Sequence, residues 1–392
     1  IRSKPIKPPT NMQSNYKPIG DYIQLIDNRN SDLAIKKLLG INIDKFFMPS
    51  VANIVDTDLS KYKIVKKNQF ACNRMHVGRD YRIPIAKSEN DSDFIVSPAY
   101  DVFEIIDQDV LLSEYLMMWF KRAEFDRNAW FYTDGDVRGG LSWNDFCNIK
   151  LPIPSLTKQQ EAVYEYNIIQ RRIDLNKQLC EKLEETAQTL YRKYFVDDID
   201  VENLPEGWNV SSLDKIANYL NGLPCQKFQT NSIDFLSVIK IKELNQGFTN
   251  KESDRVSKKI PRNFIIQDGD VVFSWSGTLI IDFWCGGIGA LNQHLFKVTS
   301  TKYAKWFYYL WTKSYIEDFN NLISAKATSM GHIKREDLSN AEVLLPSKTD
   351  LEEMHKDMNP IFNELIIRKR ETFKLLELQS LLLAKLGGRE RL

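Results

Sequence analysis

Two segments of this sequence repeat one plan, and that repeat limits the possible folds more than any other feature. Residues 145–155 (DFCNIKLPIPS) are similar to residues 337–347 (DLSNAEVLLPS), and each ends in Pro-Ser after alternating apolar positions. The same spacing pairs Gly139 with Gly331 and Trp119 with Trp311. Self-similarity at one fixed spacing is the signature of a duplicated architecture. The sequence therefore predicts two copies of a globular part followed by a long segment.

Each Pro-Ser is followed by a predicted long helix. Residues 157–195 contain neither Gly nor Pro. A matching apolar stripe follows the second Pro-Ser, where Pro360 predicts a kink and Gly387-Gly388 predicts the end of the helix. Apolar residues recur about every 3.5 positions, which is typical of a coiled coil. Asn176 is the single polar member of the first stripe, as expected of a buried amide that fixes register. The predicted seam comprises Ile169, Ile173, Asn176, Leu183, Leu190, Leu365, Leu375 and Leu382.

The globular parts read as α+β domains, each with a small twisted sheet. Short β-type runs at 62–65, 82–85, 94–96 and 102–105 have counterparts at 264–266, 270–273 and 294–298, and helices are predicted at 111–125 and 303–319. We therefore predict domains at 1–154 and 198–346, with long helices at 155–197 and 347–392. The expected fold class is α+β, with two pseudo-symmetric globular domains separated by two long helices packed as an antiparallel coiled coil. Two ordinary amphipathic helices, each packed on its own domain, are the alternative.

Composition and motifs narrow the function. Lys and Arg number 53 against 52 Asp and Glu, which excludes a globally basic binder. No apolar run approaches the roughly 18 residues of a membrane span. Five scattered cysteines without a Cys-x-x-Cys pair predict a cytoplasmic protein with no zinc site. There is no phosphate-binding loop, the four histidines are isolated, and Gly286–Gly289 reads as a turn. The sequence predicts a binding protein with no catalytic residue and no metal.

Positive charge gathers in the first copy. Between Lys61 and Arg82 there are seven basic residues against one acid, Asp80. Lys and Arg attract phosphates, while Arg and Asn discriminate bases, so this segment predicts contact with double-stranded DNA. A solvated charged face is the alternative, and it weighs more in the second copy, where polar loops replace the dense charge. The predicted DNA-binding residues are Lys63, Lys66, Lys67, Asn73, Arg74, His76, Arg79, Arg82, Ser274, Trp275, Ser276, Thr278, Asn292 and Gln293.

Taken together, these features resemble the specificity subunit of type I restriction-modification enzymes. The resemblance rests on the doubled plan, on LPIPS at 151–155 and VLLPS at 343–347, on Gln-Gln-Glu at 159–161, and on the loops at 73–80 and 95–100. These motifs are loose individually and specific in combination. The second helix departs from the pattern, because it opens with Asp-Leu-Glu-Glu at 350–353.

The resemblance implies a subunit without catalysis of its own. Such a subunit reads a bipartite DNA target and holds two methyltransferase subunits, which motor-nuclease subunits can join. S-adenosylmethionine, ATP and Mg²⁺ would belong to those partners. Antiparallel helices roughly 58 Å long would then hold the two domains apart and set a non-specific spacer. A coiled-coil scaffold that never touches DNA is the rival, and an enzyme with an unfamiliar active site is a third possibility.

Overall fold

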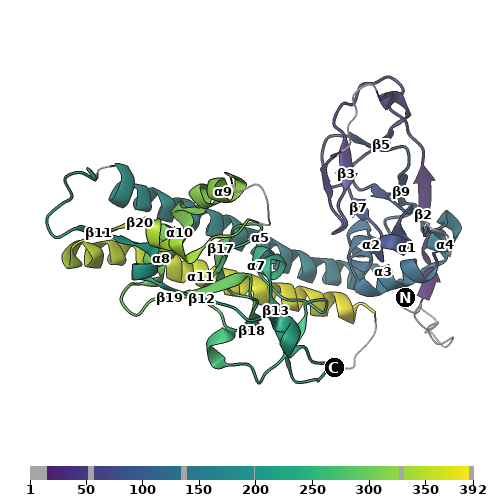
Figure 1. The fold of residues 1–392 in the computed structure, drawn as a ribbon. Helices are drawn as coiled ribbons and strands as arrows, with labels where there is room; N and C mark the ends of the chain where they lie inside the picture. The colour runs from purple at the N-terminus through teal and green to yellow at the C-terminus, as the bar shows by residue number, and fades with distance from the viewer. Residues whose placement is uncertain (1–15, 52–56, 134–138, 198, 326–330, 388–392) are drawn as a thin grey trace. The chain divides into compact units, whose positions relative to one another are not determined.

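The computed structural model describes residues 16–51, 57–133, 139–197, 199–325 and 331–387. The chain divides into two compact units (Figure 1): residues 1–170 with 378–392 form the first, and residues 171–377 form the second. Two long helices, α5 (Leu156–Arg192) and α11 (Lys348–Lys385), each contribute to both units. No helix among the described residues is long and apolar enough to span a membrane.

The first unit is built on a four-stranded antiparallel sheet with the order β2-β9-β6-β7. Its strands are β2 (Ile23–Ile26), β6 (Phe70–Cys72), β7 (Ile85–Lys87) and β9 (Asp101–Ile105). Three further antiparallel pairs are β1 (Tyr16–Pro18) with β10 (Lys150–Pro152), β3 (Leu39–Ile41) with β4 (Phe47–Pro49), and β5 (Lys63–Val65) with β8 (Phe94–Val96). The helical elements are η1 (Ile19–Asp21), η2 (Leu59–Lys61), α1 (Val77–Asp80), α2 (Ser113–Phe120), α3 (Ala123–Phe131) and α4 (Trp143–Asn148).

Aromatic side chains hold the helices of the first unit against this sheet. Phe70 on β6 stacks on Phe103 on β9, with their ring centroids 5.1 Å apart. Phe120 on α2 and Phe146 on α4 meet Phe103 from the helical side, and all four side chains are fully buried. Edge-to-face and offset contacts of this kind are the favoured geometries of aromatic pairs. The alternating apolar positions of β6 and β9 thus bring their rings to one face of the sheet.

The second unit contains two four-stranded sheets, whereas the sequence predicted one small sheet per domain. The first is antiparallel with the order β12-β19-β16-β17, and the second is mixed with the order β14-β13-β18-β15, in which β13 and β18 are parallel. The paired strands β11 (Asn209–Ser212) and β20 (Glu342–Leu345) flank them. The sheet strands are β12 (Asn218–Asn221), β13 (Phe235–Ile239), β14 (Arg255–Ser257), β15 (Ile265–Ile266), β16 (Asp270–Ser274), β17 (Ile281–Trp284), β18 (Gly289–Leu291) and β19 (Leu295–Thr299).

The helices of the second unit complete its core. Residues 285–288 form the turn between β17 and β18, as the sequence predicted for the Gly-Gly segment. On α8, the fully buried Trp306 and Tyr309 pack over the first sheet and against α11. The helical elements are α6 (Leu213–Ile216), η4 (Cys225–Phe228), α7 (Ile241–Gln246), η5 (Arg262–Phe264), α8 (Lys305–Ser314), α9 (Ile316–Ala325) and α10 (Arg335–Asn340).

The two units share one topology. In the first unit, β2 pairs with β9, β9 pairs with β6, and β6 forms a hairpin with β7. In the second unit, β12 pairs with β19, β19 pairs with β16, and β16 forms a hairpin with β17. Backbone bonds repeat as well: Leu141 N–H donates to Arg74 O at 3.0 Å, and Ile333 N–H donates to Trp275 O at 2.9 Å. The donors Leu141 and Ile333 lie at the spacing of the sequence repeat, whereas the acceptors Arg74 and Trp275 are nine residues further apart. Shared strand order and shared bonds are what a duplicated chain would retain.

Each predicted domain helix is interrupted. Residues 111–125 were expected to form one helix, but α2 ends at Phe120 and α3 begins at Ala123, because Arg122 adopts an extended backbone conformation. In the second copy, α8 ends at Ser314 and α9 begins at Ile316, and Tyr315 between them keeps a helical backbone conformation. A break after the buried Trp of each copy lets the chain turn back over the sheet. The spacing of apolar residues alone did not reveal these breaks.

Within the second unit, α5 and α11 run in opposite directions. Arg172 Nε lies 2.8 Å from Glu371 Oε1, and further along α5 the hydroxyl of Tyr194 donates to Asp357 Oδ2 at 2.5 Å. Residues later in α5 therefore contact residues earlier in α11, as in an antiparallel pair. The helix α11 continues through Pro360, and it ends at Lys385; Gly388 of the predicted stop lies outside the described residues.

The buried stripe of α5 follows the predicted seam only as far as Ala187. Ile169, Ile173 and Asn176 are buried, and Leu183 is half-buried. Beyond Ala187 the buried residues are Tyr191 and Phe195, whereas Leu190 is half-buried. There the helix packs on α8, with the rings of Tyr191 and Trp311 5.3 Å apart, and it finishes in the π-helical turn η3 (Lys193–Asp197). On α11, Leu365 is buried, and Leu375 and Leu382 are half-buried.

Candidate nucleic-acid interface

In the second unit, the loop after β16 and the loop before β19 lie together at one end of the main sheet. Trp275 connects them, because its indole N–H donates to Asn221 Oδ1 at 3.0 Å and to the carbonyl oxygen of Gln293 at 3.1 Å. Ser276 Oγ lies 3.0 Å from His294 Nδ1. Residues that are distant in sequence are thereby gathered at one sheet end, which we call the Trp275 cluster: Asn221, Trp275, Ser276, Gln293, His294 and His332.

Sequence reasoning missed three members of the Trp275 cluster. His294 and His332 are isolated in the sequence, yet the Trp275 ring lies 6.0 Å from the first and 5.7 Å from the second. Asn221 was not considered, because it belongs to a different strand. A signal for His332 was available, since residues 331–333 occupy in the second copy the place of residues 139–141 in the first.

The predicted residues of the second copy divide by exposure. Ser274 and Asn292 are buried, and both serve the fold: Ser274 Oγ accepts from Ile280 N–H at 2.7 Å, and Asn292 Oδ1 accepts from His294 N–H at 3.2 Å. Ser276 is buried at 7% exposure beside His294. Thr278 is exposed, and Trp275 and Gln293 are half-buried, so these three side chains present surface to a ligand.

In the first unit, the loop after β6 is the counterpart of the loop after β16, and Arg74 occupies the place of Trp275. The Arg74 Nε–H donates to Asp101 Oδ2 at 2.6 Å, and the guanidinium also donates to the carbonyl oxygen of Leu141. Its side chain is 18% exposed and lies over the Trp143 ring, 5.6 Å from the centroid. Arg74 therefore ties the loop to the neighbouring segments.

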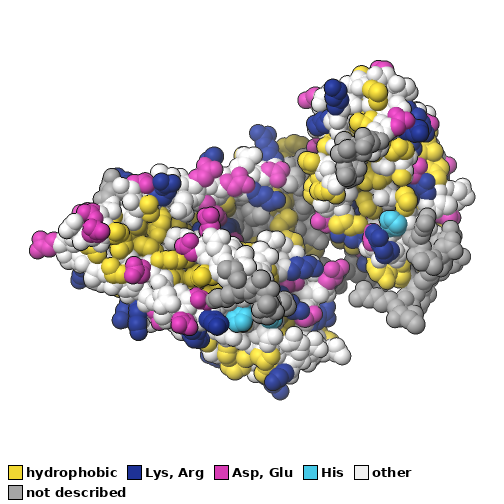
Figure 2. Space-filling model, turned by 45° about the horizontal axis from the view of Figure 1, so that its top comes forward, with side chains coloured by type: hydrophobic (Ala, Val, Ile, Leu, Met, Phe, Trp, Pro, Cys, Tyr) yellow, Lys and Arg dark blue, Asp and Glu magenta, His cyan; other side chains and the backbone are white. Residues whose placement is uncertain are grey.

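Most of the predicted basic segment has acidic partners in the fold. Lys67 pairs with Asp91 at 2.5 Å, and Arg82 pairs with Asp44 at 2.9 Å. The hydrogen bond from Arg79 holds the pKa of Asp80 below its usual value. Acids from outside the segment thus neutralise much of the charge counted in the sequence. On the face shown in Figure 2, basic and acidic side chains are accordingly intermixed.

The remaining predicted residues of the first copy differ in their surroundings. Lys63 Nζ donates to the Tyr100 carbonyl oxygen at 2.8 Å, whereas Lys66 is exposed and forms no ion pair with any described residue. Asn73 Oδ1 accepts from Met75 N–H at 3.1 Å, and His76 precedes α1 as its N-cap residue. The Arg79 side chain is 65% exposed and pairs with Asp80. Met75 and Tyr81, which are close to Arg79 in the sequence, are exposed as well.

Groups that could perform other chemistry are not gathered here. Within the described ranges, no three His, Cys, Asp or Glu side chains are grouped so that they could hold a metal ion. Burial raises the pKa of the Cys180 thiol to about 11 and of the Cys285 thiol to about 12, so both stay protonated at neutral pH. The polar side chains of the Trp275 cluster and of the loop after β6 are suited to hydrogen bonding with a ligand.

Known proteins that are similar to this chain are type I specificity subunits. Residues 205–375 match the family model of the type I restriction modification DNA specificity domain. Over 306 residues the chain is 22% identical to the type I restriction enzyme MjaIX specificity subunit of Methanocaldococcus jannaschii, covering 72% of this chain and 70% of that protein. It is 24% identical over 189 residues to the HindI specificity subunit of Haemophilus influenzae, covering 46% of this chain and 40% of that protein.

A solved structure extends the likeness to the whole fold. The S subunit of a type I restriction-modification system from M. genitalium superposes with a TM-score of 0.56 and 13% identity, covering 98% of this chain and 99% of that one. The fold is therefore of the α+β class with two sheet-rich parts and long helices, as predicted. The chain resembles the specificity subunits of type I restriction-modification enzymes, and most of its second unit matches the model of their DNA specificity domain.

Proposed function

We propose that this chain is the non-catalytic, DNA-reading specificity subunit of a type I restriction-modification complex. Each unit reads one half of a bipartite target in double-stranded DNA. The observation that carries this proposal is the shared topology: both units place the loop after the central strand and the loop before the last strand at the same end of the same sheet. Loops on a rigid scaffold are the common carriers of recognition.

The helices α5 and α11 set the spacer between the half-sites. A helix of 37 residues such as α5 is about 56 Å long, which corresponds to somewhat more than one and a half turns of B-DNA at about 34 Å per turn. The opposed directions of the two helices in the second unit support an antiparallel coiled coil. In such a pair, the two readers face half-sites of opposite orientation.

Two methyltransferase subunits dock on the helices, and motor-nuclease subunits join them. Support comes from apolar side chains on α5 and α11 that are not covered within their own units. Leu175 and Ile367 are half exposed in the second unit, and Ile168 and Leu381 are more than half exposed in the first. Exposed apolar rows on helices mark protein contacts. S-adenosylmethionine, ATP and Mg²⁺ belong to these partner subunits, in the cytoplasm.

Salt-dependent binding of the full chain to duplex DNA tests the proposal. A DNA reader loses affinity linearly in the logarithm of salt concentration, because phosphate contacts release counterions. We expect this dependence for random-sequence duplex, and tighter binding to the duplex that the reconstituted methyltransferase complex methylates. A coiled-coil scaffold without DNA readout would bind the methyltransferase subunits but show neither behaviour.

A further inference from the structure

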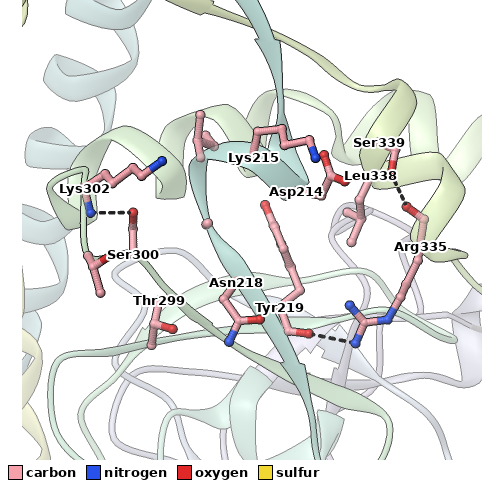
Figure 3. A pocket seen from close by; sticks show the side chains of 13 residues that line it. Asp214, Lys215, Asn218, Tyr219, Thr299, Ser300, Lys302, Arg335, Leu338 and Ser339 are labelled. Carbon is pink, nitrogen blue, oxygen red and sulfur yellow. Dashed lines mark hydrogen bonds between the residues drawn. The ribbon is translucent and has the colours of Figure 1, made fainter.

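The second unit contains an open cavity of about 580 Å³ beside β12, which we call the β12 cavity (Figure 3). Its walls come from α6, β12, the segment after β19 and α10. Figure 3 shows Lys302 and Arg335 on opposite sides, with Asn218 and Thr299 between them. Hydroxyl groups of Ser300 and Ser339 add further hydrogen-bonding capacity. None of these residues belongs to the predicted DNA-binding set.

The charge of this cavity is positive and unpaired. Lys215, Lys302 and Arg335 line it, against the single carboxylate of Asp214. That carboxylate is engaged by the hydroxyls of Ser212 and Ser339, at 2.8 Å from the latter, and these bonds hold its pKa below the usual value. Within the part of the chain that the structure describes, none of the three cations forms an ion pair. In the first unit, by contrast, ion pairs with Asp residues are formed by Lys67, Arg74, Arg79 and Arg82.

The cavity lies next to the Trp275 cluster. The strand β12 carries Asn218 and Tyr219 at the cavity and Asn221 in the cluster. Arg335, which donates to the Tyr219 carbonyl oxygen at 3.3 Å, follows His332 by three residues. Three residues span at most about 11 Å, so a duplex held at the cluster brings its backbone within reach of the cavity.

The first unit has no equivalent of this charge. Matching backbone bonds pair Leu213 with Ile19, so Lys215 corresponds to Asp21. The burial patterns of β9 and β19 match Phe103 with Phe296, and each of these pairs with the Phe of the neighbouring strand, so Lys302 corresponds to Asp109. Two acids, Asp21 and Asp109, thus stand in the first copy where the second copy has two lysines. The two copies share a topology but differ at this position.

We infer that the β12 cavity binds a phosphate group of the DNA backbone next to the half-site read by the second unit. This inference rests on the proposed function. Three unpaired cations with hydroxyl donors suit a phosphodiester, which attracts cations and accepts hydrogen bonds regardless of base sequence. The second unit therefore grips the backbone at a point where the first unit does not, and this grip orients the Trp275 cluster over the bases.

The test measures binding of the full chain to a random-sequence duplex over a series of salt concentrations. We expect Lys215→Gln, Lys302→Gln and Arg335→Gln each to weaken binding on every sequence and to flatten the slope of log K against log salt by about one. Arg335→Lys keeps the charge and should keep the slope. Lys182→Gln removes an exposed lysine of the same unit that is paired with Glu185, and should change nothing.

Three outcomes separate the hypotheses. An unchanged slope in the triple glutamine variant, with the fold confirmed by circular dichroism, overturns the inference while the proposed function stands. A wild-type chain without salt-dependent DNA binding overturns the proposed function first. Inorganic phosphate serves as the second probe. Phosphate could raise the melting temperature of the wild type but not of the triple variant, while the salt slope of DNA binding is the same in both. In that case the cavity is a site for free phosphate, and its assignment to the DNA backbone is wrong.

Discussion

At the scale of single residues, Gln159 shows how one buried amide fixes the start of a long helix. Its Oε1 accepts from Leu112 N–H at 2.9 Å, and its Nε2 donates to the carbonyl oxygens of Val110 and Pro154 at 2.8 and 2.9 Å. The side chain is fully buried in the first unit. The second copy has Leu351 at the same place, half-buried against its apolar core, so the two helix starts are held by different chemistry.

Gln159→Leu should therefore destabilise the chain. The substitution leaves the Leu112 N–H and the two carbonyl oxygens without their amide partner, and an unsatisfied buried group costs about 1–3 kcal/mol. Chemical denaturation should show this loss, whereas the neighbouring Gln160→Leu, at an exposed position, should leave the midpoint nearly unchanged. Equal midpoints for the two variants would show that the amide bonds contribute nothing to stability.

Arg79 and Arg74 should respond differently to replacement by alanine. Arg79→Ala is expected to alter discrimination in the half-site read by the first unit by about 1–3 kcal/mol per lost base contact. Arg74→Ala is expected to lower stability as well, because the guanidinium holds Asp101 and the Leu141 carbonyl oxygen. Binding measured on a panel of half-site variants, together with melting curves, distinguishes the effects. Uniform weakening by Arg79→Ala on all sequences would make it a phosphate contact only.

At the scale of elements, an ion-pair network joins the long helices in the second unit. Glu184 on α5 lies 3.3 Å from Lys369 on α11 and 2.9 Å from Lys313 on α8, and Lys369 also pairs with Asp282 on β17. Burial tends to raise the pKa of Glu184, but the two lysines hold it below the ordinary value of 4.5. The folded chain therefore favours the ionised carboxylate.

This network predicts an acid-sensitive helix pair. A carboxyl group whose pKa is lower in the folded state stabilises the fold above its unfolded pKa, and this contribution is lost as the pH falls below about 4.5 through the folded value. Glu184→Gln should reduce the slope of unfolding free energy against pH in that range. Glu185→Gln, on the exposed side, serves as the matched control. The same dependence of unfolding free energy on pH below about 4.5 in Glu184→Gln and the wild type would contradict the prediction.

The long helices were predictable because their signal is local, and the failure at the end of α5 has a specific cause. A spacing near 3.5 describes a helix that meets one partner helix. Past Ala187, α5 still contacts α11 through Tyr194 and Asp357, but it also packs Tyr191 and Phe195 against Trp311 on α8, so its buried side follows the domain core. The partner of Asn176 was equally out of reach, since the amide donates to Glu371 at 3.1 Å on the distant helix.

At the scale of the whole molecule, the repeat predicted two related units, but local charge did not predict the binding surface. The acids that neutralise the basic segment of the first copy, Asp44, Asp91 and Asp101, come from outside that segment, and only the fold brings them there. The reverse holds for the β12 cavity, where Lys215, Lys302 and Arg335 are too widely spaced to appear as a cluster in the sequence. A motif in the sequence consists of residues that are close along the chain, whereas the β12 cavity is lined by residues that only the fold brings together.

The proposed role of α5 and α11 in setting the spacer belongs to this scale as well, and it predicts that longer helices lengthen the spacer. Seven residues inserted after Gln178, matched by seven after Arg370 on α11, add two helical turns between the antiparallel contacts at Glu371 and Lys369. Seven residues lengthen a helix by about 10 Å, which equals about three base pairs at 3.4 Å each. Mapping methylated adenines with the reconstituted complex should show both half-sites unchanged and the spacer longer by that amount.

An insertion of equal size after Lys251, in the turn between α7 and β14, separates this expectation from a general loosening of the chain. That turn is exposed and lies outside the long helices, so the spacer should keep its length. If the helix variant methylated the original spacing, the helices would not determine the distance between half-sites. If both insertions broadened the tolerated spacing alike, flexibility would explain the result. Only a defined shift confined to the helix variant fits a rigid strut, because a rigid rod transmits added length without adding freedom.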